Sequence, residues 1–191
     1  MTSSPPSVLI VEDETELAEL FAQWLSEEYD VRVATSGEEA LEEVDEDIDV
    51  VLLDRLMPGI SGDEVLETIR ERDLSVRVAM VTAVEPDFDV LEMGFDDYVV
   101  KPLFREDLQR LVSGLLERDE YDQQLAEMFA TASKLAALES HKTEAELAES
   151  DEYRRLKDEF EDTRHRIEEL ESRMETGDFE AVFYDFEDAD L

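Results

Sequence analysis

Three carboxylates stand directly after apolar runs whose length fits buried β-strands. Glu12 and Asp13 follow residues 8–11, and Asp54 follows residues 50–53. The carboxyl ends of neighbouring parallel strands meet at one edge of a sheet, so we expect these three acids to converge there. Carboxylates packed that closely repel one another, and a hard divalent cation with oxygen ligands relieves the repulsion. The pattern therefore predicts a Mg²⁺ site formed by Glu12, Asp13 and Asp54.

Beside such a cation, Asp54 is the candidate nucleophile. A metal-bound carboxylate can attack a phosphoryl phosphorus while the metal neutralises charge on the transferred oxygens. Thr82 and Lys101 also stand at the ends of apolar runs. A hydroxyl and an ammonium group at those positions would contact the remaining phosphoryl oxygens. Each residue alone is typical of a solvated surface or a turn, but their occurrence in this order favours a phosphoryl-transfer site.

The elements that must position these residues alternate along the first part of the chain. Short apolar runs predict strands at residues 8–11, 31–34, 50–53, 76–81 and 98–100. Apolar residues at helical spacing predict helices at residues 17–25, 38–44, 63–72, 87–93 and 105–116. This alternation, with strands that are apolar on both faces, predicts an α/β fold with a doubly wound parallel sheet.

The second part of the chain has the pattern of long amphipathic helices. No Gly or Pro occurs from residue 115 to residue 176, and apolar residues recur at spacings of three and four. One apolar seam lies within residues 121–135 and another within residues 153–174, where Thr163 replaces an expected apolar residue. We therefore expect an all-α extension after the sheet.

The segment between the two seams decides whether the helices form a hairpin or a nearly continuous coiled-coil rod. Thr143 and Glu146 fit a capping box, and Ser150 with Asp151 offers a second helix start. Both arrangements stay open, and the hairpin is favoured because two short heptad runs support a coiled coil only weakly. The expected organisation is a phosphoacceptor domain at 7–117, a helical domain at 118–175 and an acidic, aromatic segment at 176–191, which is either a partner-binding motif or, as we favour, a flexible tail.

Composition excludes several classes of protein. The chain has 55 acidic and 17 basic residues and a formal net charge of −38, which argues against direct binding of DNA. Such an acid-rich surface is best tolerated in concentrated salt, which suggests a halophilic host. The absence of Cys excludes disulfides and thiolate metal sites, and apolar runs are too short to span a membrane. Because residues 1–7 lack the features of a signal peptide, a cytoplasmic location is expected.

Four stretches resemble the receiver domain of two-component response regulators. They are VLIVEDE at 8–14, VLLDRLMPGISG at 51–62, VTA at 81–83 and DDYVVKP at 96–102. The resemblance covers about residues 7–117 and implies a flavodoxin-like sheet of strand order 2-1-3-4-5. It also implies a metal site in which Mg²⁺ binds Asp13, Asp54 and the Leu56 carbonyl, with Glu12 holding the metal through water.

The same resemblance implies a phosphorylation switch. Asp54 would be the phosphoacceptor, and Lys101 would pair with the phosphoryl group. Thr82 would move toward that group, and Tyr98 would turn inward as the readout. In this family the peptide bond matched by Lys101 and Pro102 is cis. The switch would be biased by charge, because phosphorylation adds charge and acceptor oxygens at one point of a bistable element.

The helical region resembles the HalX-type domain that follows receivers in halophilic archaea, through residues 129–134 and 149–153. The expected partners are a sensor histidine kinase and an unidentified output protein that contacts residues 118–175, and a homodimer stays open. Residues 86–95 carry no basic side chain, although receivers that dimerise through this region usually have them there. Arg55 is uncommon next to the acceptor, and it would either alter access to the phosphoryl group or balance neighbouring acids.

We expect a signalling switch whose output is protein–protein contact, rather than an enzyme. One alternative is a response regulator that acts in transcription, although no helix-turn-helix pattern is present. Another is an aspartyl phosphatase of the haloacid dehalogenase type, which normally has a second acid two residues after the nucleophile, where this chain has Leu56. His141 and His165 lie in charge-rich stretches and are expected to be solvated rather than phosphorylated.

Overall fold

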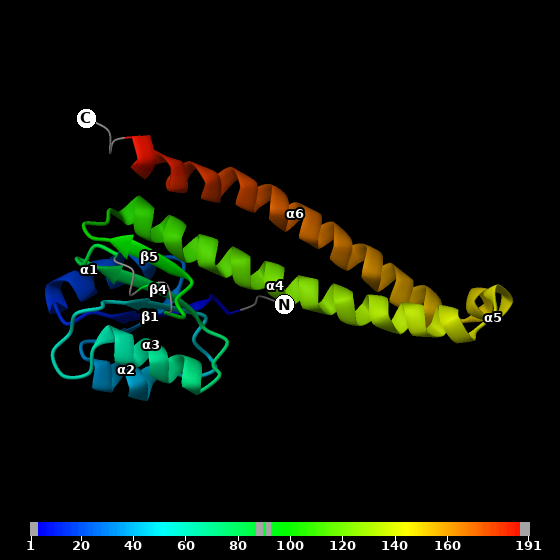
Figure 1. The fold of residues 1–191 in the computed structure, drawn as a ribbon, viewed down its shortest axis with the longest axis horizontal. Helices are drawn as coiled ribbons and strands as arrows, with labels where there is room; N and C mark the ends of the chain where they lie inside the picture. The colour runs from blue at the N-terminus through cyan, green and yellow to red at the C-terminus, as the bar shows by residue number, and fades with distance from the viewer. Residues whose placement is uncertain (1–3, 87–89, 91–92, 188–191) are drawn as a thin grey trace. The chain divides into compact units, whose positions relative to one another are not determined.

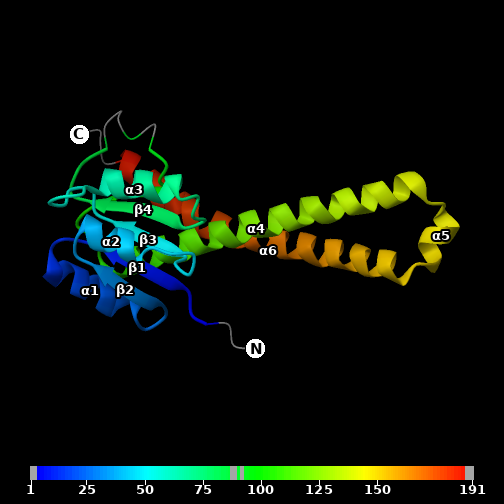
Figure 2. The ribbon, with the colours of Figure 1, turned by 90° about the horizontal axis from the view of Figure 1, so that it is seen from below.

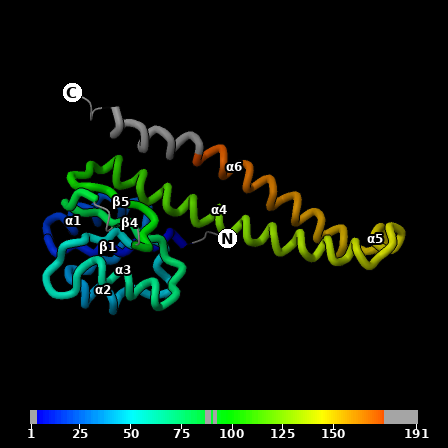
Figure 3. The backbone as a smooth tube through the Cα atoms, viewed as in Figure 1, coloured from blue at the N-terminus to red at the C-terminus, as the bar shows by residue number. Residues whose placement is uncertain are grey.

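A computed structural model describes residues 4–86, 90 and 93–187 of the chain, with side chains through residue 174 (Figure 3). The helix expected at 87–93 therefore falls largely outside the described residues. The chain divides into two compact units, residues 1–116 and 117–191. The elements are β1 (Ser7–Val11), α1 (Thr15–Leu25), β2 (Asp30–Ala34), α2 (Gly37–Glu43), β3 (Val50–Leu53), α3 (Gly62–Glu71), β4 (Arg77–Thr82), β5 (Asp97–Val100), α4 (Arg105–His141), α5 (Glu144–Glu149) and α6 (Asp151–Glu187).

The first unit contains a parallel sheet of five strands in the order β2-β1-β3-β4-β5. β1 lies between β2 and β3, with Val8 opposite Val31 of β2 and Val50 of β3. β4 pairs with β5, so that Thr82 stands opposite Val100. The α/β class, the doubly wound parallel sheet and the order 2-1-3-4-5 predicted from the sequence are confirmed.

Each face of the sheet is covered by its own apolar layer, because successive side chains of a strand point to opposite faces. Leu9 and Val11 of β1 belong to the layer under α2 and α3, which lie together on one side of the sheet in Figure 1. Val8 and Ile10 belong to the opposite layer, under α1 and the first turns of α4. The buried helix residues of that second layer are Ala18, Phe21, Leu25, Leu108, Val112 and Leu115.

The loop from β3 into α3 passes very close to the end of β3. Ser61 caps α3 in a capping box with Glu64: the Glu64 amide donates to the Ser61 hydroxyl, and the Ser61 amide donates to Glu64 Oε2. A Cβ added to Gly62, the next residue, would lie 2.1 Å from the backbone oxygen of Asp54. Only glycine therefore allows the start of α3 to approach the residue after β3 this closely.

The second unit contains an antiparallel helical hairpin, as favoured from the sequence. Residues of α4 beyond 116 and residues of α6 run side by side away from α5 in Figures 1 and 2. The Tyr121 hydroxyl donates to Glu171, and the Tyr153 hydroxyl donates to Glu139, at opposite ends of the paired region. The capping box predicted at Thr143 and Glu146 opens α5 at the turn.

The long helices differ from the sequence-based expectations at two places. α4 runs without interruption from Arg105 to His141, so the helix expected to end at residue 116 continues into the hairpin. α6 extends to Glu187, so most of the segment expected to be a flexible tail at 176–191 is assigned to a helix, and residues 188–191 lie outside the described part of the chain. α4 continues past residue 116 because no Gly or Pro follows Gly114 within it to stop the helix.

Within the described residues, no helix combines the length and the apolar composition that crossing a lipid bilayer requires.

The close approach at Gly62 should be sensitive to a single methyl group. We expect Gly62→Ala to lower the free energy of unfolding by about 1–3 kcal/mol, because the added Cβ overlaps the Asp54 carbonyl. Denaturant unfolding of the full chain in molar salt measures the change. Gly94→Ala is the control, since its nearest neighbour would be a side-chain carbon of Arg70 at 3.3 Å. An equal effect of the two variants would contradict the steric explanation.

The first unit should fold without the hairpin, because neither apolar layer of the sheet contains a residue beyond Leu116. A chain of residues 1–117 is expected to unfold cooperatively and to keep the sheet's circular dichroism. An insoluble fragment, or one with a gradual unfolding transition, would show that residues beyond 117 complete the core.

Candidate functional site

The carboxyl end of the sheet brings together the acids that follow β1 and β3. The Glu12 amide donates to the carbonyl of Ala34 in β2, and the Asp54 amide donates to that of Val11 in β1, so both backbones are still held by neighbouring strands. Glu12 is 3% and Asp54 8% exposed, whereas Asp13 is exposed. Carboxylate oxygens of Glu12, Asp13 and Asp54 lie within 4.8 Å of one another. A cluster of hard oxygen donors that is this compact fits Mg²⁺.

Lys101 provides the positive charge of this cluster. Its Nζ lies 2.5 Å from Glu12 Oε2 and 2.6 Å from Asp54 Oδ2, so one ammonium bridges acids from two strands. Burial raises the pKa of Glu12, although the hydrogen bond from Lys101 opposes this effect. Desolvation alone would lower the pKa of Lys101, but its hydrogen bonds to Asp54 and Glu12 outweigh desolvation and raise that pKa. The peptide bond between Lys101 and Pro102 is cis.

The side chains of Thr82 and Tyr98 are both hydrogen-bonded to the backbone of Val84. Thr82 is fully buried at the end of β4, and its hydroxyl accepts from the Val84 amide at 3.3 Å. The half-buried Tyr98 packs its ring on Phe95, with centroids 5.5 Å apart, and its hydroxyl donates to the Val84 carbonyl at 2.8 Å. The Lys101 amide donates to the Thr82 carbonyl at 2.8 Å. These contacts join the predicted switch residues to the strand end that carries Lys101.

The residues just before β5 are fixed by a partly buried ionic contact. The Asp96 carboxylate accepts from Arg70, Arg77 and the Val78 amide at 2.8 to 3.0 Å. Arg70 also donates to the carbonyls of Gly94 and Val76. This network ties the start of β5, and with it Tyr98, to α3 and β4.

Sequence reasoning missed the contact made by Arg55. Its guanidinium donates three hydrogen bonds to the Asp63 carboxylate in the first turn of α3: Nε lies 3.0 and 3.2 Å from the two oxygens, and Nη2 lies 3.1 Å from Oδ2. Only 12% of the Arg55 side chain is exposed. The pair favours the role of Arg55 in balancing neighbouring acids, and it fastens the loop beside Asp54. The eight-residue separation gave no helical or strand pattern from which the pair could be predicted.

Within the described part of the chain, the structure gives three other predicted residues no specific contact with the carboxylate cluster beyond the backbone bond of one of them to Asp54. The Leu56 amide donates to Asp54 Oδ1 at 3.2 Å, and the Leu56 side chain is 66% exposed, so its carbonyl as a metal ligand stays a prediction. His141 and His165 have exposed side chains on the hairpin. The Nδ1 atom of His165 lies 3.4 Å from a carboxylate oxygen of Glu168, an ordinary surface arrangement for two residues one helical turn apart.

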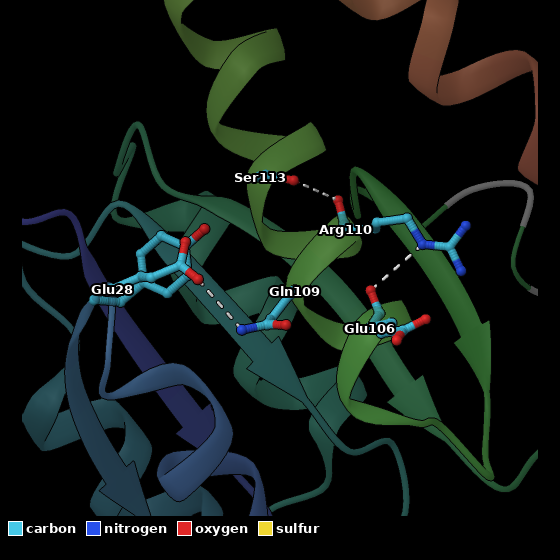
Figure 4. Close-up of a pocket in the computed structure, with 6 residues that line it drawn as sticks. Glu28, Glu106, Gln109, Arg110 and Ser113 are labelled. Atoms are coloured by element: carbon cyan, nitrogen blue, oxygen red, sulfur yellow. Dashed lines mark hydrogen bonds between the residues drawn. The ribbon is translucent and has the colours of Figure 1, made fainter.

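A shallow polar pocket in the first unit lies apart from these residues. It is lined by the turn between α1 and β2 and by the start of α4, through Glu28, Tyr29, Glu106, Gln109, Arg110 and Ser113. In Figure 4 the Gln109 amide points at the Glu28 carboxylate, to which it donates at 3.3 Å. Arg110 donates to Asp107 and to the Glu106 carbonyl, and Ser113 donates to the Arg110 carbonyl, so these groups have local partners, and we place the candidate site at the carboxylate cluster instead.

Two family models match the chain in succession. Residues 8–113 match the response regulator receiver domain, and residues 117–183 match the HalX domain. The receiver match covers more than half of the chain and contains all the residues of the carboxylate cluster.

Relatives with similar sequences support the same family. A transcriptional regulator of Haloferax volcanii is 49% identical over 138 residues, which are 72% of this chain and 24% of that protein. The sensory transduction protein RegX3 of Mycobacterium tuberculosis is 44% identical over 117 residues, which are 59% of this chain and 51% of that protein. The chain thus spans between about a quarter and a half of these relatives' length.

A solved structure shares the fold of the first unit. The response regulator TrrA of Thermotoga maritima, in complex with Mg²⁺ and BeF, aligns with a TM-score of 0.52 and 36% identity. The alignment covers 58% of this chain and 99% of TrrA. The chain therefore belongs to the response regulator receiver domain family of two-component systems, and a HalX domain follows its receiver domain.

Proposed function

We propose that the chain is a phospho-accepting signalling switch in which Asp54 takes a phosphoryl group from a sensor histidine kinase. The observation that carries the proposal is the position of Asp54, which lies nearly buried against Lys101 and beside Glu12 and Asp13. In the transfer, an Asp54 oxygen forms a bond to phosphorus while the phosphorus–nitrogen bond to the donor imidazole breaks. The imidazole keeps that bonding electron pair and is protonated by solvent.

The carboxylates of Glu12, Asp13 and Asp54, with the Leu56 carbonyl, would hold Mg²⁺. When bound, Mg²⁺ neutralises negative charge on the phosphoryl oxygens. Lys101 is already within hydrogen-bond distance of Asp54, so its ammonium can stay with the carboxyl group and pair with a phosphoryl oxygen. The Mg²⁺ and BeF bound in the TrrA complex support this assignment by similarity.

The proposed switch depends on two hydrogen bonds to the backbone of Val84. Thr82 accepts from the Val84 amide, and Tyr98 donates to the Val84 carbonyl. If the Thr82 hydroxyl turns toward a phosphoryl group on Asp54, it leaves the Val84 amide and empties part of the space beside the Tyr98 ring. Phosphorylation would then bias two arrangements of one element, as a bistable switch requires.

The output would be a protein–protein contact made by residues 118–175, and we propose no catalytic turnover of a substrate. A role in transcription is the second candidate, because the Haloferax volcanii relative is named a transcriptional regulator. A mobility-shift experiment with phosphorylated protein in molar salt separates the two. Retention of DNA by this chain alone would favour direct action in transcription, and its absence would favour output through a protein partner.

Asp54→Asn should abolish labelling by acetyl phosphate, because an amide oxygen is a poor nucleophile toward phosphorus. Mg²⁺-dependent, acid-labile incorporation into the full chain measures this. Asp30→Asn, at the amino end of β2, is the matched control and should be labelled normally. Undiminished labelling of Asp54→Asn would move the acceptor elsewhere, and steady release of many phosphate molecules per chain would favour a phosphatase.

Lys101→Ala should lower the free energy of unfolding of the metal-free chain by about 2–4 kcal/mol, because two buried carboxylates would face each other without their cation. We expect Mg²⁺ still to bind and to restore part of the lost stability. Thermal unfolding with chelator or Mg²⁺ measures both effects, with the exposed Lys157→Ala as control. In the phosphorylated variant the NMR signals of Tyr98 should no longer shift, and a normal shift would contradict the role of Lys101.

A further inference from the structure

One face of α4 in the second unit is almost free of charge, in contrast to the rest of the chain. Residues 123–138 contain one acid and one base, in a chain with 55 acidic and 17 basic residues. The seam toward α6 uses Tyr121, Leu125, Met128, Ala132 and Leu135, which are half-buried. About a third of a turn around α4 lies a second row, exposed throughout, which we call the alanine–serine stripe: Ala126, Ala130, Ser133, Ala137 and Ser140.

The stripe has the composition of a buried helix contact. Its members are spaced by four, three, four and three residues, the repeat by which one helix packs along another. The Ser133 and Ser140 hydroxyls donate to backbone carbonyls four residues earlier, at 2.9 and 2.7 Å, so neither needs water or a partner group. Beside the stripe, Phe129 is 62% exposed, although aromatic side chains of this size are usually buried. The row of small side chains leaves room for a neighbouring helix to approach closely, and such a helix would cover the exposed ring of Phe129.

The charges along the other edge of the stripe indicate what covers it. From one end to the other, this edge carries Glu120, Glu127, Lys134 and His141. Within the residues that the structure describes, Glu127 and Lys134 take part in no ion pair. Two copies of α4 packed antiparallel along their stripes would place Glu127 of each copy opposite Lys134 of the other. His141 would likewise stand opposite Glu120, although the Glu120 carboxylate already lies 3.5 Å from Arg173 of α6 in its own chain, so the pair of Glu127 and Lys134 carries the charge argument.

The small side chains of the stripe fit together in the same antiparallel register as the charged pairs. When Ala130 packs beside Ser133 of a second copy, Ala126 meets Ala137 and Phe129 lies over Ala136, a small residue that leaves room for the ring. A parallel pairing instead places this charged edge against the edge of Phe129 and Ala136, where no complementary charge is available. Shape and charge thus select the same two-fold arrangement, which is the property of an isologous interface.

We propose that the alanine–serine stripe of α4 is a homodimer interface, with α4 of a second copy packed antiparallel on it. The interface is short, and two chains of net charge −38 repel each other, so the dimer forms in concentrated salt and dissociates on dilution of the salt. This contact is separate from the Asp54 site, and its formation does not require phosphorylation.

Sedimentation of the full chain in molar KCl, over a range of protein concentrations, tests the proposal. The wild type should be a dimer at high concentration, and Ala130→Glu should be a monomer, because it places a charge in the stripe. Ala145→Glu adds the same charge to an exposed position on α5 and should leave the dimer intact. A monomeric wild type would overturn the proposal and leave a different protein as the occupant of the stripe. A dimer that persists in Ala130→Glu would place the interface elsewhere.

Charge exchange tests the register even if Ala130→Glu perturbs the helix. Glu127→Lys should weaken dimerisation by about tenfold, since two symmetry-related attractions become repulsions. The double variant Glu127→Lys with Lys134→Glu should restore it, and failure of this rescue would contradict the antiparallel pairing. The same variants should accept phosphate on Asp54 normally, so a failure here leaves the proposed switch untouched.

Cross-linking gives the orientation directly, because the chain has no natural Cys. In the antiparallel dimer the two copies of residue 130 are offset by only about 4.5 Å along the helix axis, and the two copies of residue 140 by about 25 Å. A short thiol-reactive linker should therefore join Ala130→Cys chains but not Ser140→Cys chains. Equal cross-linking of both variants would indicate a parallel pair and overturn the proposal.

Discussion

The ammonium of Lys101, held between Glu12 and Asp54, is the contact on which the first unit depends. It joins residues that are 89 and 47 positions apart in sequence, at the ends of β5, β1 and β3. Nearly buried carboxylates are stable only when they are paired, so the three strands must end at the same level for any one of them to be satisfied. The pairing that stabilises these carboxylates therefore also fixes the alignment of the strands.

Much of this site could be predicted from the sequence, because its geometry follows from a rule about sheets. Parallel strands that end in Glu12, Asp54, Thr82 and Lys101 leave those side chains at one edge whatever the details of the loops. The two apolar layers were equally predictable, since strands that are apolar on both faces need cover on both sides. The individual roles of these residues in phosphoryl transfer and signalling go further than the geometry and remain part of the proposed function.

The features that escaped prediction depend on contacts without a periodic pattern. The pair of Arg55 and Asp63 exists only because the loop after β3 folds back on the start of α3. The continuity of α4 could not be predicted for a different reason. A change in which face is apolar, near residue 117, marks a change of packing partner, but it does not interrupt backbone hydrogen bonds, and nothing between Gly114 and His141 breaks the helix.

The hydroxyl of Tyr98 donates to a main-chain carbonyl, that of Val84, rather than to a side chain. Any amino acid at position 84 supplies the same oxygen, so genetic drift at this position leaves the contact in place. Position 98 has no such freedom, because only a ring that ends in a hydroxyl both fills the space and reaches the carbonyl. The two ends of this hydrogen bond therefore differ in their tolerance of substitution, because a new side chain at position 84 keeps the acceptor, whereas loss of the hydroxyl at position 98 removes the donor.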